Sequence, residues 1–226
     1  MLDKIRRQFR QLTQPFLWRM YKWYLSSERW YHYQNLAVKV APSVFHPGLL
    51  FSTKILLKFI LKLDLNGKKA LELGAGSGLL ALSAARVGAV VLATDINPIA
   101  VESIEESKDK NQLSLTIVLS DLFDDISAQK FDFIFLNPPY FAQEAQNDRE
   151  KAFFCGANFE YFYKLFAQMG AYCEPWTEIY MILTDDCAID KIKSIATSQK
   201  FSWNLVEQKV VWGETNFIFL LQIPSE

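Results

Sequence analysis

From about residue 40 onward, short apolar runs alternate with longer segments of helical periodicity, and this alternation constrains the fold more than any other feature. The apolar runs lack the polar alternation of half-exposed strands, and continuous apolar strands are typical of sheets buried on both faces. The first five runs are KALELG, AVVLATD, LTIVLSD, FDFIFL and TEIYMILTD. With helical segments between them, they predict an α/β fold with a mostly parallel sheet covered on both sides.

Two further apolar runs, FSWNLVEQKV and TNFIFLLQI, close the chain without a helix between them. Strands joined by a short connection pair antiparallel. We therefore expect a seven-stranded sheet whose last strand is antiparallel. The segment before these runs, DDCAIDKIKSIATSQ, predicts a helix that begins at its acidic pair, where negative charge is favourable.

Composition excludes several classes of protein. Half of the 226 residues are hydrophobic, which is enough for a large core, and no apolar run approaches the length of a membrane span. Neither the three cysteines (Cys155, Cys173 and Cys187) nor the two histidines (His32 and His46) have metal-ligand spacing. We expect a soluble cytoplasmic protein with reduced thiols, no secretory signal and no bound metal.

The first 30 residues differ in charge from the rest of the chain. They hold seven basic and two acidic residues, a net charge of +5, which leaves −6 for the remainder. Apolar residues at helical spacing, followed by the aromatic stretch WRMYKWYLSSERWYHY, predict an amphipathic helix packed on the domain. A substrate-docking arm or a membrane-surface helix is the alternative. We expect a basic aromatic extension over residues 1–40 and one domain over residues 41–226.

The carboxyl ends of the predicted parallel strands carry residues suited to a ligand. In such sheets, ligands bind beyond those ends. The first strand ends in LELGAGSG, whose Gly74, Gly76 and Gly78 permit a tight turn and a close approach to the backbone. Asp95 ends the second strand, where it can bind both ribose hydroxyls, and Asp121 ends the third, where it can meet an adenine edge. A plain strand-to-helix turn would explain the glycines alone. It would not explain why three successive strands each bring a suitable residue to the same edge of the sheet.

These motifs together resemble class I S-adenosylmethionine-dependent methyltransferases over residues 40–223. The resemblance rests on E-x-G-x-G-x-G from Glu72, the acidic end of the second strand, S-D-L-F after the third and N-P-P-Y after the fourth. The N-P-P-Y form is similar to the branch that methylates amide or exocyclic nitrogens, including HemK-like glutamine methyltransferases and small-domain N-methyltransferases. The resemblance implies a Rossmann-like doubly wound sheet and S-adenosylmethionine as the cofactor.

The resemblance also implies positions for the cofactor. VFHPGLLFSTKILL is similar to the segment that folds over the cofactor in this branch, which makes Thr53 a candidate contact. The segment GANFEYFYKLF departs from the branch's G-x-D-G pattern at Asn158 and Phe159, so the substrate does not carry over through it. The implied cofactor residues are Thr53, Glu72, Gly74, Ala75, Gly76, Gly78, Asp95, Ile96, Asp121, Leu122 and Asn137.

The N-P-P-Y segment fits methyl transfer to a planar nitrogen. Such a nitrogen is a poor nucleophile because its lone pair is delocalised. The Asn137 side-chain oxygen and the Pro138 carbonyl can each accept one N–H, which stabilises the charge that develops on the nitrogen. We expect Pro139 to hold the turn rigid, and Tyr140 and Phe141 to stack on the substrate.

Three functions compete for this sequence. The first is methylation of a protein glutamine amide, which we favour because the body of the domain is acidic. The second is the same chemistry on an exocyclic amine of an RNA or DNA base, adenine N6 or guanine N2, which the basic N-terminal region favours. The third is a non-catalytic S-adenosylmethionine-binding module, which the N-P-P-Y segment argues against.

Overall fold

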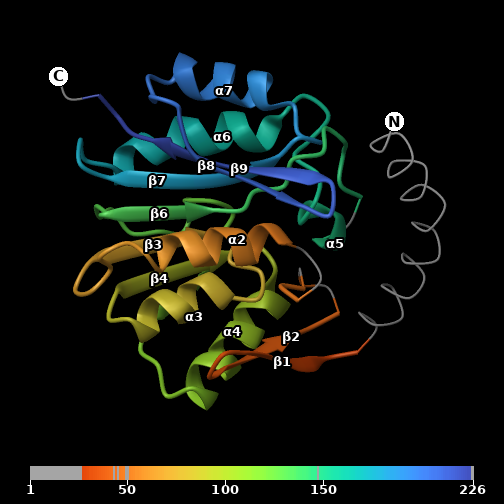
Figure 1. The fold of residues 1–226 in the computed structure, drawn as a ribbon, viewed down its shortest axis with the longest axis vertical. Helices are drawn as coiled ribbons and strands as arrows, with labels where there is room; N and C mark the ends of the chain where they lie inside the picture. Colours follow the sequence, from red (N-terminus) through yellow and green to blue (C-terminus); the bar gives the residue numbers. More distant parts are fainter. Residues whose placement is uncertain (1–26, 43, 45, 49–50, 147, 225–226) are drawn as a thin grey trace.

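A computed structural model describes residues 27–224, apart from 43, 45, 49–50 and 147. Seven strands form one sheet in the order β5-β4-β3-β6-β7-β9-β8, and β9 runs antiparallel to both of its neighbours (Figure 1). The predicted sheet and its antiparallel last strand are therefore confirmed. The strands are β3 (Lys69–Leu73), β4 (Val90–Asp95), β5 (Thr116–Leu119), β6 (Phe133–Leu136), β7 (Glu178–Thr184), β8 (Asn204–Val211) and β9 (Glu214–Leu221).

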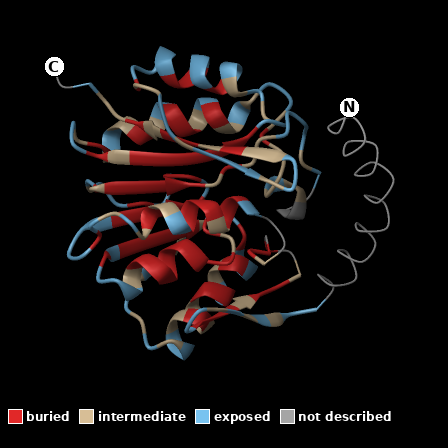
Figure 2. Ribbon diagram, viewed as in Figure 1, coloured by how far each residue is buried: buried red, intermediate tan, exposed pale blue. Residues whose placement is uncertain are grey.

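Helices cover both faces of the sheet, and each face has its own core. Alternate strand residues point to opposite sides, so Ala70 of β3 packs in one core whereas Leu71 and Leu73 pack in the other. The central strand β6 is buried along its whole length (Figure 2). The first core includes α2 (Phe51–Ile60), α3 (Leu79–Arg86) and α4 (Pro98–Lys110), and the second includes α6 (Glu160–Met169) and α7 (Ile189–Ser198). Short helices α5 (Asp148–Lys151) and η1 (Gly170–Tyr172) complete the described helices.

A β-hairpin precedes the domain core and packs against α4. Strands β1 (Arg29–Tyr33) and β2 (Leu36–Val40) pair antiparallel. The side chain of Asn111 in α4's C-terminal cap accepts a hydrogen bond from the Ala37 N–H at 3.0 Å and donates one to its carbonyl at 2.6 Å. Residues 29–33 are therefore a strand and not part of an aromatic helix, because the hairpin satisfies their backbone groups. The part of that predicted amphipathic helix before residue 27 lies outside the described residues.

The last helix begins later than its acidic pair predicts. Asp185 and Asp186 lie in a turn, closed by a hydrogen bond from the Cys187 N–H to the Thr184 carbonyl at 3.0 Å. The helix α7 starts at Ile189, and Asp190 is the acidic residue in its first turn. The expected helix start at the acidic pair is wrong, because the pair forms the turn that follows strand β7.

None of the helices over residues 27–224 that the structure describes is both long and apolar enough to cross a membrane. Over the same described residues, no three His, Cys, Asp or Glu side chains group closely enough to hold a metal ion.

Candidate functional site

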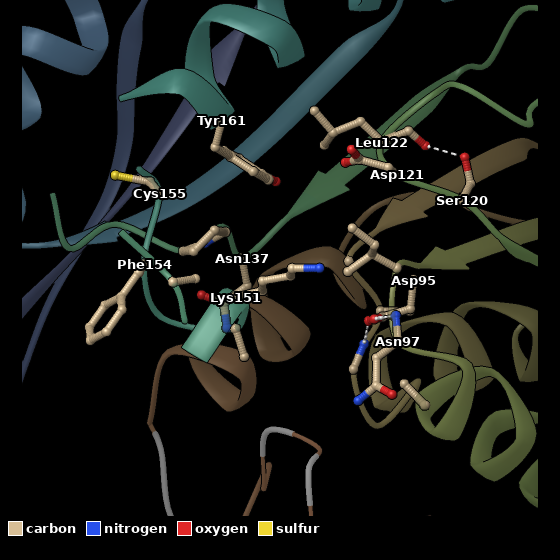
Figure 3. A pocket seen from close by; sticks show the side chains of 18 of the residues that line it. Asp95, Asn97, Ser120, Asp121, Leu122, Asn137, Lys151, Phe154, Cys155 and Tyr161 are labelled. Atoms are coloured by element: carbon tan, nitrogen blue, oxygen red, sulfur yellow. Dashed lines mark hydrogen bonds between the residues drawn. The ribbon is translucent and has the colours of Figure 1, made fainter. Parts of the chain in front are cut away.

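A cavity of about 430 Å³ opens at the carboxyl ends of strands β3 to β6 (Figure 3). Eleven residues that the sequence singles out line it, although they come from five separate stretches of the chain. The sheet brings them together because parallel strands present their carboxyl ends at one edge. These residues are Thr53, Glu72, Gly74, Ala75, Gly76, Asp95, Ile96, Asp121, Leu122, Asn137 and Pro139.

The glycine loop between β3 and α3 has the backbone that its spacing predicts. Gly74, Gly76 and Gly78 have φ values of +66°, +54° and +71°, which residues with a Cβ rarely adopt. A Cβ on Gly74 would meet no atom within 4 Å, so its open side faces the cavity. A Cβ on Gly78 would lie 2.8 Å from Ile104 Cγ1 of α4. Gly78 does not line the cavity, and its lack of a side chain serves the packing of two helices.

Asp95 joins the end of strand β4 to the glycine loop. Its Oδ2 accepts a hydrogen bond from the Gly76 N–H at 2.7 Å, and its Oδ1 accepts one from the Asn97 N–H at 2.8 Å. Burial raises the pKa of this carboxyl, and the backbone hydrogen bonds oppose that rise. The backbone N–H of Ile96 also contributes a hydrogen bond. A carboxylate has about four lone-pair sites, so Asp95 can still accept a hydrogen bond from a hydroxyl in the cavity.

Glu72 is a buried carboxyl at the floor of the same cavity, with 4% of its surface exposed. Its Oε2 accepts a hydrogen bond from the Ala81 N–H at 2.7 Å. Burial raises its pKa to about 8, and the negative charge of Asp95 adds to the rise. A cationic group bound next to Glu72 would stabilise its ionised form, because opposite charge lowers a carboxyl pKa.

The loop after strand β5 is tied to helix α6. Lys164 of α6 donates hydrogen bonds to the carboxylates of Asp121 and Asp124, each at 2.7 Å. The Ser120 hydroxyl donates to the Leu122 carbonyl at 2.9 Å, and Leu122 has a φ of +57°. Asp121 thus lines the cavity while one of its oxygens is already paired with Lys164.

Asn137 lies at the carboxyl end of β6 and is held by helix α2. Its Nδ2 donates to the hydroxyl of Ser52 at 3.2 Å and to that of Thr53 at 3.1 Å. Both hydroxyl residues are buried, whereas Asn137 lines the cavity. Because the amide nitrogen is occupied by two partners from α2, Oδ1 is the atom left to accept a hydrogen bond from a ligand.

The rest of the N-P-P-Y segment departs from expectation. Pro139 lines the cavity, but Pro138, Tyr140 and Phe141 do not. Tyr140 packs against the core on the α6–α7 side, with its ring 4.8 Å from that of Phe141. Burial raises the pKa of Tyr140, with Cys187 the next contribution. Of the predicted stacking platform, Tyr140 is thus turned into the protein, whereas Phe141 is exposed but outside the cavity.

Several cavity residues were missed by the sequence analysis. The segment after N-P-P-Y folds back, with the Cys155 N–H donating to the Phe141 carbonyl at 2.9 Å, and so brings Phe154 and Cys155 to the cavity wall. Tyr161 enters from α6 and points inward (Figure 3). Only Tyr161 has a sequence signal, which is its i, i+3 spacing with Lys164. This spacing does not stand out in the sequence, because the helix carries aromatic residues on several sides.

Comparison with known proteins identifies relatives of this chain. The family profile of the methyltransferase small domain matches residues 35–160. A candidate protein N5-glutamine methyltransferase of Methanocaldococcus jannaschii is 35% identical over 108 residues, which are 47% of this chain and 52% of that protein. The ribosomal RNA small subunit methyltransferase C of Haemophilus influenzae is 34% identical over 109 residues, which are 47% of this chain and 32% of that protein. The chain thus spans about half or less of the length of these relatives.

Among solved structures, a T. thermophilus 16S rRNA N2-guanine methyltransferase, in complex with AdoMet and guanosine, superposes with a TM-score of 0.62. The match has 19% sequence identity and covers 87% of this chain and 50% of that chain. At this identity the likeness concerns the fold alone.

Proposed function

Since this chain belongs to the methyltransferase small domain family, we propose that it transfers the methyl group of S-adenosylmethionine to a planar amide or amine nitrogen of a macromolecule. A protein glutamine amide is the acceptor that we favour. The observation that carries the proposal is the placement of Asn137. Its amide nitrogen is bound by two hydroxyls, and the residue faces the cavity that Asp95 and the glycine loop also line.

The cavity residues fit the proposed cofactor. When bound, S-adenosylmethionine supplies an electrophilic methyl group. The bare backbone of Gly74 offers a close shelf beside Gly76, and the remaining acceptor capacity of the Asp95 carboxylate suits a ribose hydroxyl. Glu72 places a carboxyl where a cationic group would be stabilised. Thr53, Ala75, Ile96, Asp121 and Leu122 would form the remaining walls.

Asn137 would prepare the acceptor nitrogen for attack. Its Oδ1 accepts one N–H of the acceptor. The Pro138 carbonyl is proposed to accept the other, although Pro138 is not among the residues that line the cavity. Asn137 precedes two prolines that stiffen the turn, so its amide needs little ordering on binding. Positive charge that develops on the nitrogen is then stabilised by groups already in place. Tyr140, packed under this turn, would hold it in position and not stack on the acceptor.

The charges at the cavity favour a protein acceptor. Among its described lining residues outside the cofactor motifs, Glu144 and Glu160 balance Lys151 and Lys164. No excess of positive charge is present there to bind phosphates. The glutamine methyltransferase-like relative agrees with this choice.

An exocyclic amine of a nucleic-acid base is the second candidate. It is favoured by the +5 charge of residues 1–30 and by the ribosomal RNA methyltransferase among the relatives. A non-catalytic binding module, the third candidate, would have no use for an asparagine fixed in this way.

The test is transfer of a tritiated methyl group from S-adenosylmethionine into cell lysate, with fractions treated by nuclease or protease. We expect label that survives RNase and DNase and is lost with trypsin. Label that vanishes with nuclease and survives trypsin would reverse the choice of acceptor. The variant Asn137→Ala should fold and bind the cofactor but transfer about 10²–10³-fold more slowly. Asn137→Asp, which keeps an acceptor oxygen, is the sharper comparison, and wild-type turnover in both variants would contradict the proposed role.

A further inference from the structure

Strand β8 is an edge of the sheet with an unusual number of exposed apolar residues. It is the last strand in the order, and within the described residues it pairs only with β9. The exposed fractions are 52% for Leu205, 41% for Val206, 63% for Val210 and 88% for Trp212 in the turn that follows. An uncovered edge with apolar side chains is a surface to which another strand can add.

The outward-facing backbone groups of β8 follow from its hairpin with β9. Trp212 and Gly213 both have positive φ, +53° and +83°, and form a two-residue turn between Val211 and Glu214. Flanking residues of such a turn make the closing hydrogen-bonded pair. Because antiparallel pairs alternate, Gln208 and Val210 direct their N–H and C=O groups away from β9.

The sequence of β8 is complementary to itself in the antiparallel direction. If two copies meet with Gln208 opposite Gln208, Glu207 of each copy lies opposite Lys209 of the other. A bulge between Leu205 and Glu207 confines the regular pairing to the part of the strand from Glu207 onward. Opposite charges thus meet across the two strands, and symmetry makes this contact twice.

The side-chain faces agree with this pairing. Glu207 forms an ion pair with Lys62, with 3.0 Å between Oε2 and Nζ, and Val211 packs against the core that includes α2. The alternation of the strand puts Lys209 on the same face as these two residues. Glu207 and Lys209 of opposite copies would therefore meet on the same face of the joined sheet.

We propose that this protein forms a two-fold symmetric dimer by antiparallel pairing of its β8 strands around Gln208. The two sheets then become one continuous sheet. None of the described residues that line the cavity belongs to β8, so the interface leaves the site open. Two short strands alone make a contact at the small end of specific interfaces, so the dimer is expected to be reversible.

The test is sedimentation equilibrium of the full chain between about 1 and 100 μM, with charge reversals at the two complementary positions. Glu207→Lys and Lys209→Glu each place like charges opposite one another twice. We expect each single variant to dimerise about tenfold more weakly or worse. The double variant Glu207→Lys/Lys209→Glu restores opposite charges and should regain the wild-type dimer. Lys193→Glu, on an exposed position of α7, is the control that changes net charge away from the strand.

Three outcomes would overturn the proposal. A wild-type protein that stays monomeric over the whole range would show that the bulge at Val206 and the charge of Lys209 protect the edge. A dimer that both single reversals leave unchanged would use another surface. A double variant as weak as the single ones would exclude this register. Thermal melting of each variant checks that the fold is intact, and none of these readouts depends on methyl transfer.

Discussion

The amide nitrogen of Asn137 donates to the hydroxyls of Ser52 and Thr53, which leaves Oδ1 for a ligand. Ser52 does not line the cavity, so it can act only through Asn137. We expect Ser52→Ala to lower kcat by about tenfold while cofactor affinity stays unchanged, because one hydrogen bond that orients the amide is lost. Steady-state kinetics with separate kcat and KM values are the measurement.

The matched control for this variant is Ser83→Ala. Ser83 is also buried, and its hydroxyl donates to the Leu79 carbonyl within α3, away from the cavity. Any general effect of removing a buried hydroxyl should appear equally in both variants. If Ser52→Ala and Ser83→Ala turned over at the same rate, the orienting role of Ser52 would be excluded.

Glu72 makes the stability of the protein without cofactor depend on pH. Its pKa is about 8 in the folded state against an ordinary value of 4.5, because burial disfavours the charged form. Between these values the unfolded carboxyl is ionised while the folded one keeps its proton. The free energy of unfolding therefore falls as pH rises from about 5 to 8, and the loss levels off above that.

Urea denaturation at pH 5, 6.5 and 8 measures this dependence. We expect the wild type to lose a few kcal/mol more than Glu72→Gln across the range, since one pKa unit is worth about 1.4 kcal/mol. Gln cannot ionise, but its side-chain oxygen can still accept the hydrogen bond from the Ala81 N–H. Identical pH profiles for the two proteins would show that Glu72 is not the titrating group.

At the scale of elements, the turn from β3 to α3 uses two glycines for different reasons. Gly78 has positive φ and packs against Ile104 of α4, whereas Gly74 has positive φ and faces the open cavity. Gly78→Ala should lower the free energy of unfolding by about 2–4 kcal/mol, from backbone strain plus the clash between helices. Gly74→Ala should cost about 1–2 kcal/mol from strain alone.

For cofactor binding we expect the reverse order, with Gly74→Ala weakening the affinity for S-adenosylmethionine more than Gly78→Ala. The new methyl group of Gly74→Ala occupies the cavity, whereas that of Gly78→Ala lies between α3 and α4. Calorimetric titration with S-adenosylmethionine and chemical denaturation of both variants give the comparison. An equal loss of affinity in both would mean that the turn acts as one unit.

At the scale of the whole molecule, the hairpin β1–β2 belongs to the packing of the domain. Leu36, Val38 and Val40 are buried in the core that includes α4. Lys39 adds a hydrogen bond from its N–H to the Ser107 hydroxyl at 2.8 Å. A domain that began at residue 41, as predicted from the sequence, would therefore lack these three core residues.

Two truncations test where the folded domain begins. Deletion of residues 1–40 should lower the free energy of unfolding by several kcal/mol, because burial of one such side chain is worth about 1.5–3 kcal/mol. Deletion of residues 1–26 keeps the whole hairpin, so the difference in stability between the two truncations measures what residues 27–40 contribute. Thermal and urea melts of both variants decide the matter, and equal stability of the two would place the boundary at residue 40 after all.

The sequence by itself determined the features that depend on neighbouring residues. Continuous apolar runs predicted the buried strands, and the missing helix between the last two predicted the antiparallel β9. The spacing of Gly74, Gly76 and Gly78 predicted the turn, since positive φ selects glycine at each position independently of the rest of the chain. Asp95 and Asn137 could be placed at one edge because parallel strands end together.

Only the tertiary structure decided the features that depend on distant residues. The contact between Ser52 and Asn137 joins positions 85 residues apart, and no local pattern marks a serine as its partner. Tyr161 reaches the cavity because α6 packs on the sheet, whereas Tyr140, next to Asn137's own turn, packs away from it. Side-chain direction at the end of a strand is set by which neighbours fill the space around it. Those neighbours come from other elements, so their positions follow from packing and not from sequence spacing.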